Sequence, residues 1–430
     1  MTENGFDKTK QRRRALLRAL GPGLIMAGAA VGVSHLVQAT RAGAEYGFLL
    51  LGLVLIACLL KYPFLEFGPR YTAATGESLL SAYRRLGRWA LGLYTLVTLS
   101  TMFAILGSVT IVTAGLAARL AGPELGTTLW SALVLGTCAI ILAIGRFRGL
   151  DLAMKLVMGL LAILTTLAVG LALGTPAHWE NLDAGPSPSA LWSAAGIAFI
   201  LALLGWMPIP LDVAAWNSLW TRQRSRQTGE APSLRHALID FRIGYIGASI
   251  LAALFLILGA LVMYGSGESF AADGVRFSGQ LANLYAATLG DWIAPVILIT
   301  AFTVMFSTTL AVTDAYPRVL GGLAAFLIPE WETSRGPIPR VYFSAMLLVT
   351  GGALAVIHFA NDVFTVLVDF ATTVSFLTAP ILAWLNLLAV RLPGVPEEAR
   401  PGPGLLWLSW TGIVFLVGFS LVWAGWRLFG

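Results

Sequence analysis

Long apolar runs alternate with short polar connections along almost the whole chain, and this pattern predicts a bundle of membrane-spanning helices. A helix needs about 20 predominantly apolar residues to cross roughly 30 Å of hydrocarbon. Eleven runs reach that length, near residues 17–43, 45–69, 89–119, 128–146, 153–174, 189–219, 239–264, 288–315, 338–359, 363–391 and 404–427. A membrane β-barrel would instead show segments of about ten residues with alternating apolar and polar positions. The pattern therefore predicts an all-α polytopic membrane protein.

Two of the predicted spans are interrupted. The first contains Gly32-Val33-Ser34-His35, and the sixth contains Met207-Pro208-Ile209-Pro210-Leu211-Asp212. In the sixth span, Pro208 and Pro210 remove two backbone donors, so a regular helix cannot pass through. In the first span, the glycine and alanine residues are also compatible with simple helix packing through small residues. Broken helices in corresponding halves of a membrane protein are typical of a transporter's binding site.

The two breaks also predict how the chain is organised. Each opens a group of five spans, as expected for two inverted repeats over about residues 17–174 and 189–391. The eleventh span, about residues 404–427, then lies outside the repeat. The polar connections are too short to bury a core of their own. We therefore expect residues 1–430 to form a single transmembrane transporter domain.

Composition and charge strengthen this interpretation. The chain is 57% hydrophobic and only 12% charged, which excludes a soluble globule with a solvated surface. Its net charge of +6 follows the topology expected when basic residues stay on the cytoplasmic side. Basic residues that fit this topology lie before the first span and after even-numbered spans: Lys8, Lys10, Arg12, Arg13, Arg14, Arg18, Arg84, Arg85, Arg88, Arg146, Arg148, Arg222, Arg224, Arg226 and Arg391, whereas the connection after the seventh span has only Arg276. We expect an integral protein of the cell membrane with a cytoplasmic amino terminus, in contact with lipid and not with nucleic acid.

Several motifs resemble those of the NRAMP family of divalent-metal transporters. The family's first helix reads approximately Gly-Pro-Gly, eight residues, Asp-Pro-Gly-Asn, then Gln-Ala-Gly-Ala-(Glu)-Tyr-Gly-Tyr. Here Gly21-Pro22-Gly23 and Ala42-Gly43-Ala44-Glu45-Tyr46-Gly47-Phe48 match without a gap. Further similarities are Thr75-Gly76-Glu77-Ser78-Leu79, Met207-Pro208 and Ser307-Thr308-Thr309. The resemblance implies a LeuT-type fold and secondary-active transport by alternating access, with a divalent metal cation as the default substrate.

The departures from the family pattern fall on the substrate site. Gly32 stands where the resemblance implies a metal-binding carboxylate, and His35 stands where it implies an amide. Ile209 replaces the histidine of the family's Met-Pro-His, while Thr101 and Ala104 occupy positions of acids in its proton route. Hard and borderline divalent cations prefer oxygen ligands, especially charged ones. The chain is therefore expected to be a divergent member with an altered substrate site.

Five residues at the breaks are the candidate substrate-binding residues: Gly32, Ser34, His35, Met207 and Asp212. A neutral His35 could ligate a metal, and a protonated one could offset an anion or carry a coupled proton, although a buried histidine is often structural. Met207 is a soft ligand or a core residue. If any metal binds, Met207 and His35 are its expected ligands. Asp212 could bind a cation or a proton, or cap a helix.

Charged residues in the second span are candidates for coupling. Lys61 could be a counter-charge for an anionic substrate, a substitute for a coupling cation, or a side chain that snorkels to the interface. Glu66 is spaced to form an i,i+4 ion pair with Arg70. Asp314 and Asp369 could belong to the same network or hold helices together.

The leading hypothesis is transport of a small inorganic ion, with a proton or sodium as a possible coupling ion. A divalent metal is the family's default substrate. The alternatives are bicarbonate or another small anion, a monovalent cation, and a sensor or assembly subunit that does not transport. The sequence carries no nucleophile and base set and no phosphate-binding loop, so we expect neither an enzyme nor a cofactor.

Overall fold

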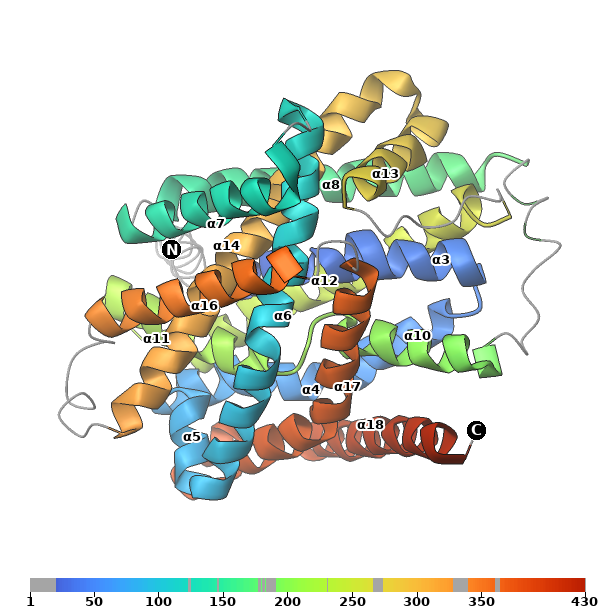
Figure 1. Cartoon of the computed structure of the whole chain (residues 1–430). Coiled ribbons are helices and arrows are strands. Elements are labelled where there is room, and N and C mark those ends of the chain that lie inside the picture. The colour runs from blue at the N-terminus through green and yellow to red at the C-terminus, as the bar shows by residue number, and fades with distance from the viewer. Residues whose placement is uncertain are drawn as a thin grey trace, which may run out of the picture.

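The computed structural model describes residues 21–122, 125–144, 147–176, 179, 182, 191–229, 231–265, 274–327, 339–359 and 364–429. This part of the chain is a bundle of helices (Figure 1). Within the described residues, eight helices are long and apolar enough to cross a membrane. They are α4 (Leu51–Thr75), α6 (Arg88–Ala121), α7 (Gly126–Ile144), α12 (Leu234–Val262), α14 (Ala294–Leu327), α16 (Pro339–Phe359), α17 (Phe364–Ala389) and α18 (Pro403–Phe429).

The remaining predicted spans are also helical, and two of them are broken. The first span comprises α2 (Pro22–Ala30), the π-helix η1 (Ser34–Ala39) and α3 (Thr40–Tyr46), with a bend of 43° at the break. The sixth comprises α10 (Ala194–Trp206) and α11 (Val213–Thr228). The fifth is α8 (Phe147–Leu173). The predicted helical spans and both predicted breaks are confirmed.

The structure adds helices that the pattern of apolar runs did not predict. α5 (Leu79–Leu86) follows α4, and α13 (Gly274–Leu289) lies in the connection before α14. The one-turn helices η4 (Asp291–Ile293) and η5 (Glu397–Ala399) lie in later connections. α13 is helical because Phe277, Leu281 and Leu284 recur on one face and are buried against the bundle. Only the full spans were long enough to be recognised from hydropathy alone.

α12 holds the first broken helix in place along its length. It packs against α2, η1 and α3. Its Asp240 accepts hydrogen bonds from the backbone of Gly21 at 3.1 Å and of Gly23 at 2.6 Å, which caps the start of α2. Further along, a Cβ on Gly43 would lie 2.0 Å from the carbonyl oxygen of Leu256, so only glycine permits this approach. Gly23 and Gly43 of the first span therefore serve contact with α12.

The second broken helix is held by different neighbours. α10 packs against α17, and α11 packs against α4. The indole of Trp206 donates a hydrogen bond of 3.0 Å to Ser375 in α17, at the end of α10. The two halves are thus fixed to separate helices on either side of the break. The division into inverted repeats and the cytoplasmic amino terminus stay predictions, and the basic residues Lys8 to Arg18 and Arg146 lie outside the described residues.

Candidate functional site

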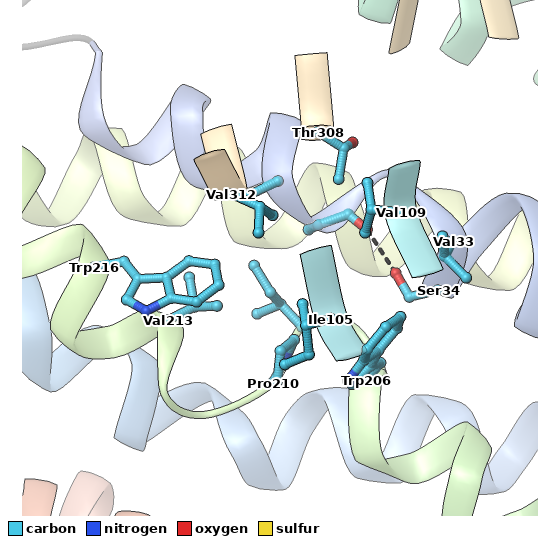
Figure 2. A pocket seen from close by; sticks show the side chains of 13 residues that line it. Val33, Ser34, Ile105, Val109, Trp206, Pro210, Val213, Trp216, Thr308 and Val312 are labelled. Carbon is cyan, nitrogen blue, oxygen red and sulfur yellow. Dashed lines mark hydrogen bonds between the residues drawn. The ribbon is translucent and has the colours of Figure 1, made fainter. Parts of the chain in front are cut away.

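A cavity of about 30 Å³ lies where the two broken helices meet, and we call it the chamber (Figure 2). The first break contributes Val33 and Ser34, and the second contributes Ile209 and Pro210. Trp206 at the end of α10 and Trp216 in α11 line it as well (Figure 2). α6 and α14 supply the remaining walls, with Ile105, Val109, Thr308 and Val312. The chamber is therefore bounded by both breaks, as the sequence predicts for a substrate site.

The chamber is mostly apolar, and none of its described lining residues is charged. Its two hydroxyl groups are both directed at the last turn of α2. Ser34 donates to the carbonyl oxygen of Ala30 at 2.6 Å, and Thr308 donates to that of Gly28 at 2.7 Å. The carbonyl groups at the end of a helix lack partners within it. Ser34 and Thr308 therefore satisfy the carbonyl end of α2 with donors from the protein.

Gly32 lies against Thr308 and has no room for a side chain. A Cβ at this position would lie 2.7 Å from Cγ2 of Thr308 and 2.8 Å from its Oγ1. Contacts that short require the neighbour to move. The space that a carboxylate would need at this position is thus occupied by Thr308.

His35 is directed away from the chamber and toward α12. Its Nδ1 lies 2.8 Å from the hydroxyl oxygen of Ser34, and its Nε2 lies 2.9 Å from the carbonyl oxygen of Ala248. The side chain is fully buried and does not line the chamber. Both ring nitrogens therefore have partners, and a metal could bind only by displacing one of them.

Lys61 reaches the end of α10 at the second break. Its ammonium group donates to the carbonyl oxygens of Leu204 at 3.0 Å, Gly205 at 3.0 Å and Met207 at 2.9 Å. The side chain is fully buried. An ammonium has three donors, and here each has one carbonyl partner at the negative end of a helix. Lys61 therefore supplies the positive charge at the carbonyl end of α10, and it does not snorkel to an interface.

Met207 and Asp212 are buried at the two ends of the second break, and neither lines the chamber. The carbonyl of Met207 is held by Lys61. Asp212 forms no ion pair within the described part of the chain, and its carboxyl group is hydrogen-bonded by the backbone at the start of α11. Lys61, Tyr94 and Tyr316 are within electrostatic range of its carboxyl group. Of the five predicted binding residues, only Ser34 lines the chamber, while the other four surround it.

Glu66 belongs to an ion-pair network near the end of α4. The expected pair with Arg70 is present at 2.5 Å. Glu66 also accepts a hydrogen bond from Tyr62, and Arg242 of α12 lies 3.5 Å from its second oxygen. Arg70 in turn donates to the carbonyl oxygen of Ala399 at 3.1 Å. The network ties α4 to α12 and to the connection before α18.

The other two acidic residues considered from the sequence also connect helices. Asp314 accepts hydrogen bonds from Trp220 at 3.0 Å, Arg318 at 2.6 Å and Tyr342 at 2.6 Å. These contacts join α11, α14 and α16. Asp369 of α17 lies 3.3 Å from Arg41 and accepts a hydrogen bond of 3.2 Å from Gln38. This second group joins α17 to the second half of the first broken helix.

Several residues of the site were not predicted. Thr308 belongs to a matched motif, Ser307-Thr308-Thr309, and that match was the available signal for its place at the first break. Trp206 and Trp216 flank the second break in sequence, but aromatic residues are common in membrane helices and gave no separate signal. The contact between Asp240 and the start of α2 could not be predicted, because more than 200 residues separate them in the chain.

The fold and the site together define a polytopic membrane transporter with a LeuT-type fold. The chain belongs to the family described as natural resistance-associated macrophage protein-like, which it matches over residues 23–424. It is 35% identical over 430 residues to an uncharacterized protein of Pasteurella multocida, covering 99% of this chain and 97% of that protein. It is 28% identical over 340 residues to the divalent metal cation transporter MntH 1 of Pseudomonas aeruginosa, covering 76% and 74%.

A solved structure gives the same picture of the fold. A point mutant of the manganese transporter of Eremococcus coleocola superposes with a TM-score of 0.68. The match covers 95% of this chain and 86% of that chain, at 14% sequence identity. The resemblance to the NRAMP family and the expected fold class are confirmed.

Proposed function

We propose that the protein is a secondary-active ion transporter that works by alternating access, with the chamber as its substrate site. The observation that carries this proposal is the position of the chamber between the two broken helices. Breaks at membrane depth place free backbone groups beside a site and allow the two halves of a helix to move separately. Membership of a transporter family supports the same function.

A divalent metal cation is the first substrate class to test, because relatives of this chain carry that name. The residues around the chamber determine which coordinating groups such an ion would find. Carbonyl oxygens at helix ends and carboxylates are the usual ligands for hard cations. In this chain the carbonyl end of α2 is held by Ser34 and Thr308, and that of α10 is held by Lys61. A bare divalent cation would have to displace these donors or bind without a carboxylate in the chamber wall.

A small anion such as bicarbonate is the second candidate, and the charge of Lys61 favours it. The ammonium adds positive charge at the second break, whereas the family carboxylate at the first break is replaced by Gly32. Val33 and Ser34, at the amino end of the second half of the broken helix, line the chamber. Amino ends of helices carry partial positive charge and are favourable for negative groups.

Flux into proteoliposomes distinguishes these substrates. Purified protein is tested with manganese, magnesium, sodium and bicarbonate. Metal transport predicts manganese flux, and anion transport predicts bicarbonate flux without a response to any divalent ion. Val109→Trp fills the chamber and should abolish the flux that is found. Leu133→Trp, the same substitution at an exposed position of α7, is the matched control and should leave it intact. Flux of a substrate that Val109→Trp does not affect would contradict the assignment of the chamber.

A further inference from the structure

A second cavity, with a volume of about 160 Å³, lies between the start of α4, the start of α10 and the later part of α18, and we call it the lateral cavity. Its walls include Leu53 of α4, Ile197 and Ile200 of α10, and Phe419 and Val422 of α18. All of its described lining residues are aliphatic or aromatic, and none of them also lines the chamber. The lateral cavity is therefore a separate site, for which ion transport gives no explanation.

The lateral cavity has a buried inner wall and an exposed rim. On the inner wall, Ile197 is 6% exposed and Ile200 is 9% exposed. On the rim, Trp192 is 71% exposed and Val422 is 50% exposed. The cavity thus opens at the surface of the bundle and extends inward between the helices.

The surface at which the lateral cavity opens faces lipid. α10 begins at Ala194, so Ile200 lies about 9 Å along the helix. α18 ends at Phe429, which places Phe419 about 15 Å from that end. The hydrocarbon core of a bilayer is about 30 Å thick. Trp192, just before α10, is a residue type that is enriched at the membrane interface. The cavity therefore lies on the hydrocarbon side of Trp192, where acyl chains surround the protein.

The segment of chain next to the lateral cavity has no large apolar side chain with which to fill it. Residues 183–190, directly before Leu191 in the cavity wall, read Asp-Ala-Gly-Pro-Ser-Pro-Ser-Ala. An apolar cavity of about 150 Å³ in another protein excludes water and binds benzene. The lateral cavity therefore fits an apolar group at least as large as benzene, supplied from outside the chain.

The physics of the bilayer decides which apolar group this is. An acyl chain gains no hydrophobic energy on leaving other lipids, because lipid tails are as apolar as leucine. It does gain dispersion contacts with walls that would otherwise line an empty space. Because the described walls carry no charged side chain, the cavity suits the acyl chain of a phospholipid and not its headgroup.

We propose that an acyl chain of a bilayer phospholipid occupies the lateral cavity and holds α10 against α18. The two helices are in contact, and α18 also packs against α4 and α17. α10 is the first half of the second broken helix, and Trp206 at its end lines the chamber. An acyl chain in the lateral cavity thus stabilises the position of one chamber wall. Its binding does not depend on which ion the protein transports.

Photochemical labelling in proteoliposomes tests the proposal. The vesicles consist of phosphatidylcholine and include a phosphatidylcholine with a diazirine in the middle of one acyl chain. After illumination, mass spectrometry locates the labelled residues. We expect label on Ile197 or Ile200, which are buried and which lipid around the outside of the bundle does not reach.

Two variants fill the lateral cavity, and a third is the matched control. Val422→Trp at the rim and Leu53→Trp in the wall remove space for the acyl chain. Each should lower labelling of the inner wall about tenfold, because the acyl chain loses most of its contacts. Val414→Trp makes the same change on α18 at a position that is 69% exposed and does not line the cavity. It should leave the labelling unchanged.

Three results would overturn the proposal. One is label confined to exposed residues such as Val422, with none on α10. Another is an equal loss of labelling in Val414→Trp and Val422→Trp. The third is a disulfide-linked dimer of Trp192→Cys in the vesicles, since this would place a second copy of the chain at the cavity; Cys58 and Cys138 are buried and give no background. The labelling needs no transported ion, so its outcome is independent of the flux measurements.

Discussion

The ammonium nitrogen of Lys61 lies 2.9 Å from the carbonyl oxygen of Met207, where the first half of the second broken helix ends. Two further carbonyl oxygens of α10 complete its hydrogen bonds. Lys61 of α4 thus interacts with the partial negative charge at the carbonyl end of α10, as a bound cation can also do at the end of a helix. The hydrogen-bond donor is part of the chain and does not depend on the ion content of the solution.

Replacing Lys61 with methionine should lower stability sharply. The substitution keeps the length of the side chain but leaves three buried carbonyl groups without a donor. Hydrogen bonds to charged groups contribute about 1.5 to 3 kcal/mol each, so we expect a loss of about 3 kcal/mol or more. The midpoint of thermal unfolding in detergent measures it. Arg391→Ala, at an exposed position, is the control and should change little. An unchanged midpoint for Lys61→Met would show that the three contacts contribute nothing.

Restoring a carboxylate at Gly32 should require a second change. Gly32→Asp alone places a side chain 2.7 Å from Thr308 and should destabilise the protein. Adding Thr308→Ala removes both atoms that approach most closely. We expect the double variant to fold and to bind manganese about tenfold more tightly than the wild-type protein, since it regains a charged oxygen ligand. Calorimetry measures the affinity, with Thr308→Ala as the control. If the folded double variant does not bind manganese, Gly32 does not occupy the position of the family's metal-binding carboxylate.

The Glu66–Arg70 pair should behave as a buried ion pair. Removing one partner leaves an uncompensated buried charge and typically costs 3–5 kcal/mol. Glu66→Gln should therefore be strongly destabilising, and Glu66→Met with Arg70→Met should cost much less than the sum of the single changes. A double-mutant cycle on unfolding free energies measures this coupling. Glu77→Gln, which breaks the exposed pair with Arg85, should cost about 0–1 kcal/mol. Equal effects for the two pairs would rule out the buried network as a stabilising element.

Two glycines offer a matched test of the packing between α3 and α12. Gly43→Ala should destabilise the protein, because the new Cβ would lie 2.0 Å from the carbonyl oxygen of Leu256. Gly52→Ala should be neutral or stabilising by up to about 1 kcal/mol, because Gly52 is in a helix with nothing within 4 Å of a new Cβ. The thermal midpoint should therefore fall for Gly43→Ala and stay the same or rise for Gly52→Ala. A tolerated Gly43→Ala would mean that the two helices do not approach this closely.

Hydropathy and proline placement predicted much of the fold. The spans follow from uninterrupted apolar runs, and the second break follows from Pro208 and Pro210. The i,i+4 spacing of Glu66 and Arg70 predicted their ion pair. These are local properties, in which the residues that interact lie close together in the chain.

The composition of the site depends on contacts between distant segments, which a single sequence does not reveal. Lys61 meets residues 204 to 207, and Thr308 meets residues 28 to 32. The resemblance located Gly32 correctly at a break, but only the structure places Thr308 against it. Most of the binding residues predicted from the sequence surround the chamber and do not line it. The reason is that a side chain near a break can point toward the chamber or away from it.

The chamber has a volume of about 30 Å³. One water molecule needs roughly 10–15 Å³ of such space, so the chamber holds about two. An ion with its hydration shell is far larger, so it must shed most of its water or push the walls formed by Trp206 and Trp216 apart. The dehydration cost of an ion is highest where the walls are apolar. The protein can therefore select against an unsuitable ion as the ion enters the chamber, before it reaches any coordinating group there.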